Sequence, residues 1–298
     1  MGECTEFRST PTDRTGSFGM TRILCLGDNT VDTYVEARVQ YPGGNAVNVA
    51  AMAARLGASS GYLGCVGDDE GGQLVRNALA VEGVDISHVR VRAGANARAY
   101  IGHVDGDRHF IHSEPGVRAD YRLEEMDFRY ISRFEHVHSS IHSDLGDDLH
   151  RIASCARSLS FDASDGWDGE LLRRIALHAR FIFLSAADLG IIEALAVAEF
   201  CLELGTEVIV LTQGSAGALG VASNGHIFQP ALPTTGVDTL GAGDGFIAGF
   251  LKAKLRGRSL KESMAKGAEV ASKVCEWSGG FGHGAAWHGD PPIVARSA

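Results

Sequence analysis

The sequence lacks features that define several classes of protein. Its six cysteines form no CxxC pair, which argues against a zinc site and against a disulfide framework. No apolar run approaches the roughly 18 residues of a membrane span, and the polar start of the chain has no apolar core of a secretory signal. These absences favour a cytoplasmic protein with reduced thiols.

Positive charge is also scarce. The 27 Lys and Arg residues are outnumbered by 37 Asp and Glu residues, so the formal net charge is −10. Nucleic acids and anionic membrane surfaces are bound by clustered Lys and Arg. We therefore expect no nucleic-acid partner and no membrane partner. A small anionic ligand held by a few local groups is still compatible with this charge balance.

Glycine, in contrast, is abundant, with 38 in 298 residues. That is about twice the usual share and indicates many tight turns or close backbone approaches. Residues 1–20 are polar and rich in Ser, Thr and Gly, and we expect them to form a disordered tail. Residues 21–298 are expected to form one domain.

Apolar runs alternate with amphipathic segments along that domain. Residues 22–28 and 207–214 are typical of buried strands, whereas residues 43–58 have a helical pattern. This alternation predicts an α/β fold in three layers, with helices on both faces of a largely parallel sheet. Residues 98–112 differ, because two strand-like runs flank an Asp-Gly pair, which predicts a β-hairpin that projects from the main sheet.

The stretch "DTLGAGDGFIAGF" (238–250) joins a glycine-rich loop to a helical pattern. The backbone N–H groups of Gly241, Ala242 and Gly243, together with the positive helix end, could bind an anion. Asp244 follows in the first turn, where it is either an N-cap or a general base. Phosphoryl transfer needs both an anion cradle and a carboxylate that accepts a proton from the attacking hydroxyl. The stretch is neither a dinucleotide-binding fingerprint nor a P-loop.

This stretch resembles the C-terminal signature D-T-x-G-A-G-D of the ribokinase-like (PfkB) carbohydrate kinases. Four further segments resemble that family in the same order: "GDNTVD", "YPGGNAVNVAAMAARLG", "CVGDDEGGQLVRNALAVEGVD" and "VLTQGSAGAL". The resemblance spans roughly residues 22–285. It implies a ribokinase-like α/β/α sandwich with a small β-sheet lid, formed around residues 33–43 and 96–114. Such a lid covers the sugar and often takes part in a homodimer contact.

The resemblance also implies roles for individual residues. Asp244 would be the catalytic base, and the amides of Gly241, Ala242 and Gly243 would form the anion hole. The implied sugar-binding residues are Asp32, Gly43, Gly44 and Asn48. The implied nucleotide-binding residues are Thr212, Gly214, Gly217, Gly241 and Gly243. Magnesium would accompany ATP. The family often carries N-x-x-E where residues 185–188 here read "SAAD", so Asp188 is either a helix cap or a contact to a magnesium-bound water.

Within this family, the sequence is most similar to the members that phosphorylate fructoselysine. The segments "GDNTVDTYV", "GGNAVNVAA" and "FDASDGWD" carry this likeness. It implies transfer of the γ-phosphoryl group of ATP to a primary hydroxyl of fructoselysine or a related fructosamine. Asp28 and Asp162 would then lie near the cationic amine of the substrate, or they are strand-end caps. The alternatives are a general ketohexose or nucleoside kinase and a non-catalytic sugar-binding protein, although binding alone would not need Asp244.

The stretch "HVHSSIH" (136–142) is rich in histidine. His136 and His138 would share one face of a strand, and His142 would follow after a turn. A zinc site would require a fourth ligand and supporting partners. The alternative is that the histidines lie at a strand end, where one of them contacts the substrate.

Overall fold

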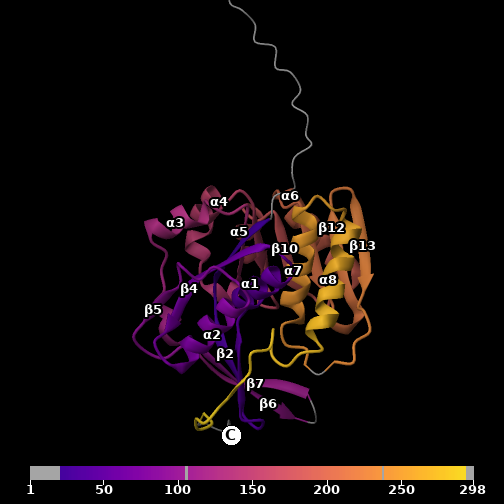
Figure 1. Ribbon diagram of the computed structural model, residues 1–298. Coiled ribbons are helices and arrows are strands. Elements are labelled where there is room, and N and C mark those ends of the chain that lie inside the picture. The colour runs from indigo at the N-terminus through magenta and orange to yellow at the C-terminus, as the bar shows by residue number, and fades with distance from the viewer. Residues whose placement is uncertain (1–20, 105–106, 237, 293–298) are drawn as a thin grey trace, which may run out of the picture.

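The larger of two sheets forms the centre of the molecule. The structure, a computed structural model, describes residues 21–104, 107–236 and 238–292 (Figure 1). This sheet has nine strands in the order β13-β12-β11-β10-β9-β8-β1-β4-β5. The strands are β1 (Arg22–Gly27), β4 (Ser59–Gly67), β5 (Arg90–Arg92), β8 (His136–Ser140), β9 (Leu159–Asp162), β10 (Phe181–Ser185), β11 (Val208–Thr212), β12 (Gly217–Ala222) and β13 (Gly225–Pro230). The strands from β11 to β5 are parallel, and β12 and β13 are antiparallel at one edge.

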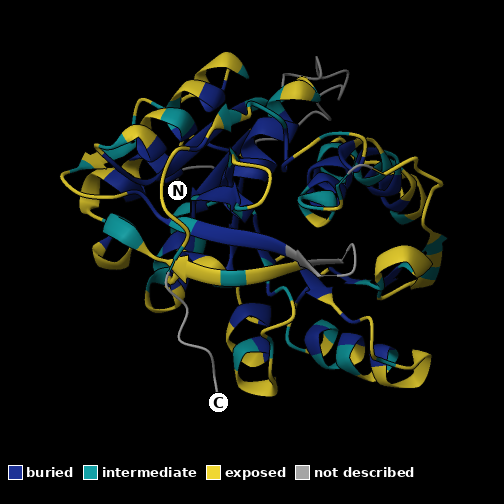
Figure 2. Ribbon diagram, turned by 90° about the horizontal axis from the view of Figure 1, so that it is seen from below, coloured by how far each residue is buried: buried dark blue, intermediate teal, exposed yellow. Residues whose placement is uncertain are grey.

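Helices cover both faces of this sheet, which confirms the predicted three-layer α/β sandwich (Figures 1 and 2). One face packs against α1 (Asn45–Arg55), α2 (Glu70–Val81), α7 (Ala242–Leu255) and α8 (Leu260–Val274). The other packs against α3 (Glu125–Ile131), α4 (Leu149–Cys155), α5 (Gly169–Ala176) and α6 (Ile191–Glu203). Four 3₁₀ turns join these elements: η1 (Gly116–Asp120), η2 (Ile141–Ser143), η3 (Gly146–Asp148) and η4 (Gly214–Ala216).

The sequence specifies several of the helix boundaries through side-chain caps. Asp69 accepts a hydrogen bond from the Gly72 N–H at the start of α2, and Ser259 with Glu262 forms a capping box at the start of α8. Helices α7 and α8 pack closely because Gly267 leaves room for the ring of Phe246. Within the described residues, no helix is long and apolar enough to cross a membrane.

A second, smaller sheet lies at one side of the sandwich (Figure 1). Its order is β14-β3-β2-β6-β7, and its strands are β2 (Thr30–Tyr34), β3 (Val39–Gly43), β6 (Arg98–Val104), β7 (Asp107–Glu114) and β14 (Ala285–Ala286). Strands β6 and β7 form the predicted hairpin, whose Asp-Gly turn falls outside the described residues. The expected N-terminal tail also falls outside them.

Strands β5 and β14 were not predicted, and β9 was implied only by the alternative that made Asp162 a strand-end cap. Each has four residues or fewer, which is too short for a clear alternation of apolar and polar side chains. Strand β14 pairs with β3 near the end of the chain. Trp287, which follows β14, packs against Tyr100 of β6 and lies under the guanidinium of Arg38.

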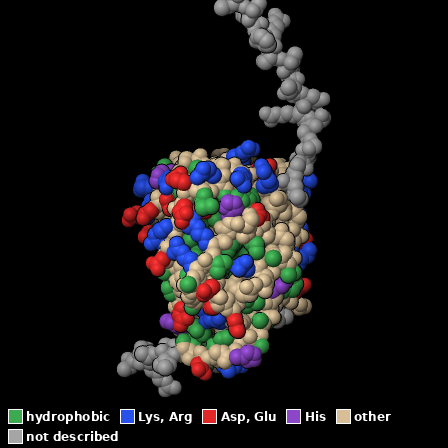
Figure 3. Space-filling model, turned by 60° about the vertical axis from the view of Figure 1, so that its left-hand side comes forward, with side chains coloured by type: hydrophobic (Ala, Val, Ile, Leu, Met, Phe, Trp, Pro, Cys, Tyr) green, Lys and Arg blue, Asp and Glu red, His purple; other side chains and the backbone are tan. Residues whose placement is uncertain are grey.

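The surface is mixed in charge on the face that Figure 3 displays, where acidic and basic side chains are interspersed.

Four of the cysteines are buried free thiols, namely Cys25, Cys65, Cys201 and Cys275.

Candidate active site

The carboxyl ends of the parallel strands meet at one edge of the larger sheet, where ligands bind in open α/β folds. Asp28 follows β1, and Asp162 is the last residue of β9, opposite Ser140 of β8 in the strand register. Thr212 ends β11 beside Ser185 of β10. Three residues that the sequence analysis proposed for the substrate or the nucleotide, Asp28, Asp162 and Thr212, therefore lie along this edge.

Helix α7 begins at the same edge, with an unusual backbone at its first residue. Gly241 is the N-cap, with φ of +78° in the left-handed region that favours glycine. A Cβ there would lie only 2.7 Å from the Cα of Gly280, so a second glycine loop presses against the helix start. Ala242 donates its N–H to the carbonyl oxygen of Thr239 at 3.2 Å. The N–H groups of Gly243 and Asp244 donate to no atom of the described residues, which leaves two donors for an anion.

Two asparagines of α1 hold the carboxylate of Asp244. The amide nitrogen of Asn48 lies 2.7 Å from its Oδ2, and that of Asn45 lies 2.7 Å from its Oδ1. The enclosure of Asp244, which is only partly exposed, raises its pKa to about 6 because burial penalises the ionised form. Asp28 adds repulsion, while the two amides and His142 favour ionisation. A base with this pKa is largely ionised at pH 7.

Asn45 is a site residue that the sequence analysis missed. Its amide nitrogen donates to Asp162 at 2.9 Å as well as to Asp244, and its Oδ1 lies 3.0 Å from Nε2 of His138. Asn45 is the first residue of α1, one helical turn before Asn48. That i, i+3 spacing places both amides on one helix face and is the signal that could have identified it.

Two further carboxylates lie near Asp244. Burial, with added repulsion from Asp244 and Asp28, raises the pKa of Asp162 to about 7. Asp28 is 4% exposed, and its Oδ1 accepts hydrogen bonds from the Ser140 hydroxyl, the Ser143 hydroxyl and the Ala46 N–H. Asp28 therefore links the end of β1 to the first turn of α1, while its Oδ2 points toward Gly44. No Lys or Arg of the described residues forms an ion pair with Asp28, Asp162 or Asp244.

The predicted sugar-binding residues surround the start of α1. Gly43 ends β3 so close to Asp32 that a Cβ would lie 1.9 Å from the Asp32 carboxylate. Gly44 has φ of +101° and would meet the backbone of Asn29. Only glycine fits at these two positions. The Oδ1 of Asn48 is buried and has no partner among the described residues.

Of the predicted nucleotide-binding residues, Gly241 and Gly243 lie at the start of α7, and the others lie around β11 and β12. Thr212 donates its hydroxyl to the carbonyl of Leu184. Gly214 and Gly217 have φ of +56° and +127°, and a Cβ at Gly217 would lie 2.2 Å from the carbonyl oxygen of Gln229. Asp188 lies in an exposed turn after β10. Among the described residues, it makes no hydrogen bond or ion pair with Asp28, Asp162 or Asp244.

The histidines do not assemble a metal site. Among the described residues, no group of three His, Cys, Asp or Glu side chains could hold a metal ion. His136 and His138 are fully buried within β8, and both contact the hydroxyl of Ser160 at 2.8 Å. His142 is exposed on η2. The strand-end interpretation therefore describes His142 better than the other two.

Comparison with known proteins identifies the class to which this fold and site belong. The pattern of the pfkB family carbohydrate kinases matches residues 17–281. The chain belongs to this family and is an ATP-dependent sugar kinase.

Individual relatives agree with this assignment. The chain is 36% identical to fructosamine kinase FrlD of Bacillus subtilis, over 88% of this chain and 94% of that protein. It is also 36% identical to fructoselysine 6-kinase of Shigella flexneri, over 88% of this chain and all of that protein. Among solved structures, a putative ribokinase II of Escherichia coli, in complex with ATP and Mg²⁺, superimposes with a TM-score of 0.75 at 20% identity, covering 88% of this chain and 95% of that chain.

Proposed function

We propose that this kinase transfers the γ-phosphoryl group of ATP to a primary hydroxyl of fructoselysine or a related fructosamine. The position of Asp244 carries the proposal. Its carboxylate lies between two amides of α1, at the start of a helix whose Gly243 and Asp244 N–H groups have no partner among the described residues. A proton acceptor and an anion cradle are thus adjacent, as phosphoryl transfer requires.

In the proposed reaction, Asp244 accepts the proton of the substrate hydroxyl as its oxygen bonds to the γ-phosphorus. The bond between that phosphorus and the bridging oxygen breaks, and ADP leaves. The backbone N–H groups of Gly241, Ala242 and Gly243 would stabilise the charge of the transferring group, after the Ala242 N–H exchanges its present acceptor. The positive end of α7 supports the same role.

We propose that Asp32, Gly43, Gly44 and Asn48 bind the sugar. Asn48 supports this role because its Oδ1 is a buried acceptor without a partner among the described residues, which a sugar hydroxyl would satisfy. The close approach of Gly43 to Asp32 supports this role too, because a side chain at position 43 would displace the Asp32 carboxylate.

The substrate amine is proposed to lie near Asp28 and Asp162. These carboxylates repel one another and Asp244, and none has a cationic partner among the described residues. A protonated secondary amine would offset this accumulated negative charge. The similarity to a fructosamine kinase and a fructoselysine 6-kinase supports the same substrate class.

On the nucleotide side, we propose that Thr212, Gly214, Gly217, Gly241 and Gly243 bind ATP together with magnesium. Asp188 is an exposed carboxylate, and no cluster of protein ligands accompanies it in the described part of the chain. This fits a magnesium ion held mainly by phosphate oxygens and water, with one protein carboxylate nearby. When bound, the ion would neutralise phosphate charge.

We also infer a cytoplasmic enzyme that forms a homodimer through the smaller sheet. Its outer strand β7 is largely exposed, including Phe110 at 62%. Light scattering of the intact chain and of Phe110→Ser tests the dimer. A monomeric intact chain would contradict it.

The decisive experiment measures ADP release with magnesium and ATP, comparing fructoselysine, other fructosamines, fructose, ribose and adenosine as acceptors. We expect kcat/KM for fructosamines to exceed that for fructose at least tenfold. A preference for fructose, ribose or adenosine would favour the ketohexose or nucleoside alternative. If none of these acceptors causes ADP release, the proposed substrate is contradicted.

Asp28→Asn tests the amine contact in the same assay. The asparagine keeps an oxygen for the serine hydroxyls and the Ala46 N–H but replaces the outward Oδ2 with an amide. We expect KM for fructoselysine to rise roughly tenfold, the worth of about 1.4 kcal/mol, while KM for fructose changes little. Equal effects on both substrates would reduce Asp28 to a helix cap.

A further inference from the structure

A row of polar side chains, most of them buried, runs along β8 and β9 and ends on Asp244. It consists of Ser158, His136, Ser160, His138 and Asn45. The successive distances are 3.0 Å from Ser158 Oγ to His136 Nδ1, 2.8 Å from His136 Nε2 to Ser160 Oγ, 2.8 Å from Ser160 Oγ to His138 Nδ1, and 3.0 Å from His138 Nε2 to Asn45 Oδ1. Asn45 then donates to Asp162 and Asp244.

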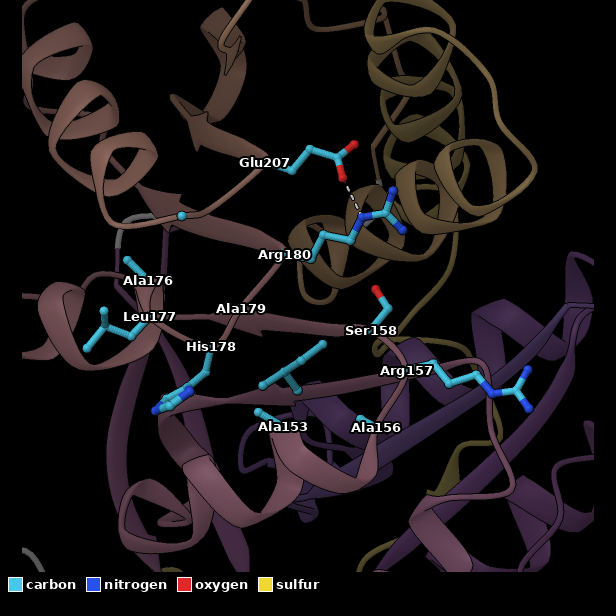
Figure 4. A pocket seen from close by; sticks show the side chains of 12 residues that line it. Ala153, Ala156, Arg157, Ser158, Ala176, Leu177, His178, Ala179, Arg180 and Glu207 are labelled. Carbon is cyan, nitrogen blue, oxygen red and sulfur yellow. Dashed lines mark hydrogen bonds and ion pairs between the residues drawn. The ribbon is translucent and has the colours of Figure 1, made fainter. Parts of the chain in front are cut away.

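Strand geometry assembles this row. His136 and His138 alternate along β8, and His138 lies opposite Ser160 of β9 in the parallel register. Period-two alternation puts Ser160 and Asp162 on the same face of β9. That face packs against α1, which supplies Asn45. The outer end, Ser158, lines a surface pocket at the amino ends of the strands, beside the ion pair of Arg180 with Glu207 (Figure 4).

The row lies beside apolar rings, where buried polar groups need hydrogen-bond partners. The ring of His136 is 5.8 Å from that of Phe181, and the ring of His138 is 6.4 Å from that of Phe183. Burial lowers the pKa of His136 well below its usual value and that of His138 to about 3. Both rings are therefore neutral.

The direction of every hydrogen bond follows from the Asn45 amide. Its Nδ2 must face the two carboxylates, because the opposite orientation would set an oxygen against them. Asn45 Oδ1 can only accept, so His138 carries its hydrogen on Nε2. Nδ1 of His138 then accepts from Ser160, whose oxygen accepts from Nε2 of His136. Nδ1 of His136 accepts from Ser158. Every donor in the row meets an acceptor in this single arrangement.

We propose that His138 is a positioning residue for the kinase reaction, because its Nε2–H, fixed through Ser160 and His136, holds the Asn45 amide in the one orientation that donates to Asp162 and Asp244. This inference rests on the proposed role of Asp244 as the base. Without the Nε2–H, only the two carboxylates orient the Asn45 amide, so its donor is held less firmly against Asp244. The ionised base would then be less favoured and less well placed.

His138→Leu removes the donor, and His138→Gln keeps one at about the same reach. We expect the Leu variant to lose kcat roughly ten- to a hundredfold and to shift the acidic limb of the kcat profile to higher pH. The Gln variant should stay within about threefold of the parent, with its limb in place. Four nearby titratable groups also interact electrostatically with the Asp244 carboxylate, namely Asp28, Asp162, Cys25 and His142. All profiles are therefore measured in a His142→Gln background, which removes the exposed imidazole.

A loss of kcat with an unmoved acidic limb, or equal losses in the Leu and Gln variants, would overturn the proposal. His178→Leu is the matched control, because His178 is exposed at the pocket, and it should leave kcat and the profile unchanged. If Asp244→Asn is nearly as active as the parent, the base assignment itself fails. If Asp244→Asn is inactive but His138→Leu behaves as the parent, only the positioning role fails.

Two measurements do not depend on the folding of the Leu variant. Ser160→Ala keeps His138 but breaks its link to His136, and it should shift the acidic limb in the same direction by a smaller amount. Nitrogen-15 histidine NMR of the intact protein should show two rings in the neutral Nε2–H form throughout pH 5 to 8. Rings that titrate in this range, or that carry the hydrogen on Nδ1, would contradict the arrangement.

Discussion

At the scale of single residues, the carboxylate of Asp244 is subject to opposing influences. Burial and Asp28 favour its neutral form, whereas the amides of Asn45 and Asn48 favour the ionised form. The balance leaves its pKa at about 6, above that of a free aspartate. A carboxylate with a raised pKa is a better proton acceptor once ionised, and the two amides keep both of its oxygens in fixed positions.

Asp244→Asn should retain nucleotide binding and lose at least about a hundredfold in kcat, the usual contribution of a general base. The substitution is close to isosteric, so its effect can be separated from packing. Calorimetric titration with ATP measures binding, and ADP release measures turnover. Turnover close to that of the parent would remove Asp244 from its role.

The pH dependence of kcat provides an independent check. Asp244 must be ionised to accept a proton, so kcat should fall as pH decreases through about 6, the raised pKa of this carboxyl, and then tenfold per pH unit. An acidic limb at about pH 4, the value of an unperturbed aspartate, would indicate that a different group limits the rate. The measurement is a set of initial rates at saturating substrates between pH 4.5 and 8.5.

At the scale of elements, the active site depends on how close α7 comes to the loop that carries Gly280. Gly241 and Gly257 flank the same helix with nearly equal φ, +78° and +77°. A Cβ at Gly241 would meet the backbone of Gly280, whereas one at Gly257 would meet nothing within 4 Å. The two positions form a matched pair that separates backbone strain from close contact.

Gly241→Ala should therefore cost more stability than Gly257→Ala. Both substitutions introduce left-handed backbone strain of about 1 kcal/mol. Only Gly241→Ala must also displace the start of α7, which costs roughly 1–3 kcal/mol more in stability. We further expect Gly241→Ala to reduce kcat/KM for ATP, and Gly257→Ala to leave it unchanged. Urea unfolding and steady-state kinetics test both. Equal stability losses would show that the contact with Gly280 relaxes freely.

The sequence predicts elements with strong local patterns and misses those created by tertiary contacts. The glycine loop before α7 and the helix after Gly44 have local signals, so the alternation of strands and helices and the position of Asp244 could be predicted. Strands β9 and β14 are too short to carry one. The link from His138 to Asn45 joins segments more than 90 residues apart, and only the packing of α1 against β8 brings them together. Local periodicity contains no information about that pairing.

At the scale of the whole molecule, the candidate active site gathers three carboxylates, Asp28, Asp162 and Asp244, without an ion-pair partner among the described residues, and their mutual repulsion lowers stability. The pKa of Asp162 is raised to about 7 in the folded chain, against about 4 in an unfolded one. The folded state thus binds this proton more tightly. The associated stability is complete below about pH 4 and is lost as pH rises through 7. Such a cost is typical of sites shaped for function.

Asp162→Asn should consequently raise the melting temperature at pH 8, by on the order of 3 °C for a chain of this size, because the amide avoids a buried charge. The gain should shrink as pH falls toward 4.5, where the parent carboxyl is protonated. Thermal unfolding at several pH values measures it, and Asp120→Asn, which removes an exposed carboxylate on η1, should show no such trend. A pH-independent gain would point to packing instead.

The placement of the tryptophans has a spectroscopic consequence. The chain has three, and each reports on a different region. Trp167 donates its Nε1–H to the carbonyl of Ser185, which pairs with Thr212 of the proposed nucleotide site, and Trp277 lies under the guanidinium of Arg55 of α1. Trp287 packs on the smaller sheet. Replacing any two by phenylalanine would leave one intrinsic fluorophore, so nucleotide binding, events at α1 and movement of the smaller sheet could be followed separately in real time without an attached dye.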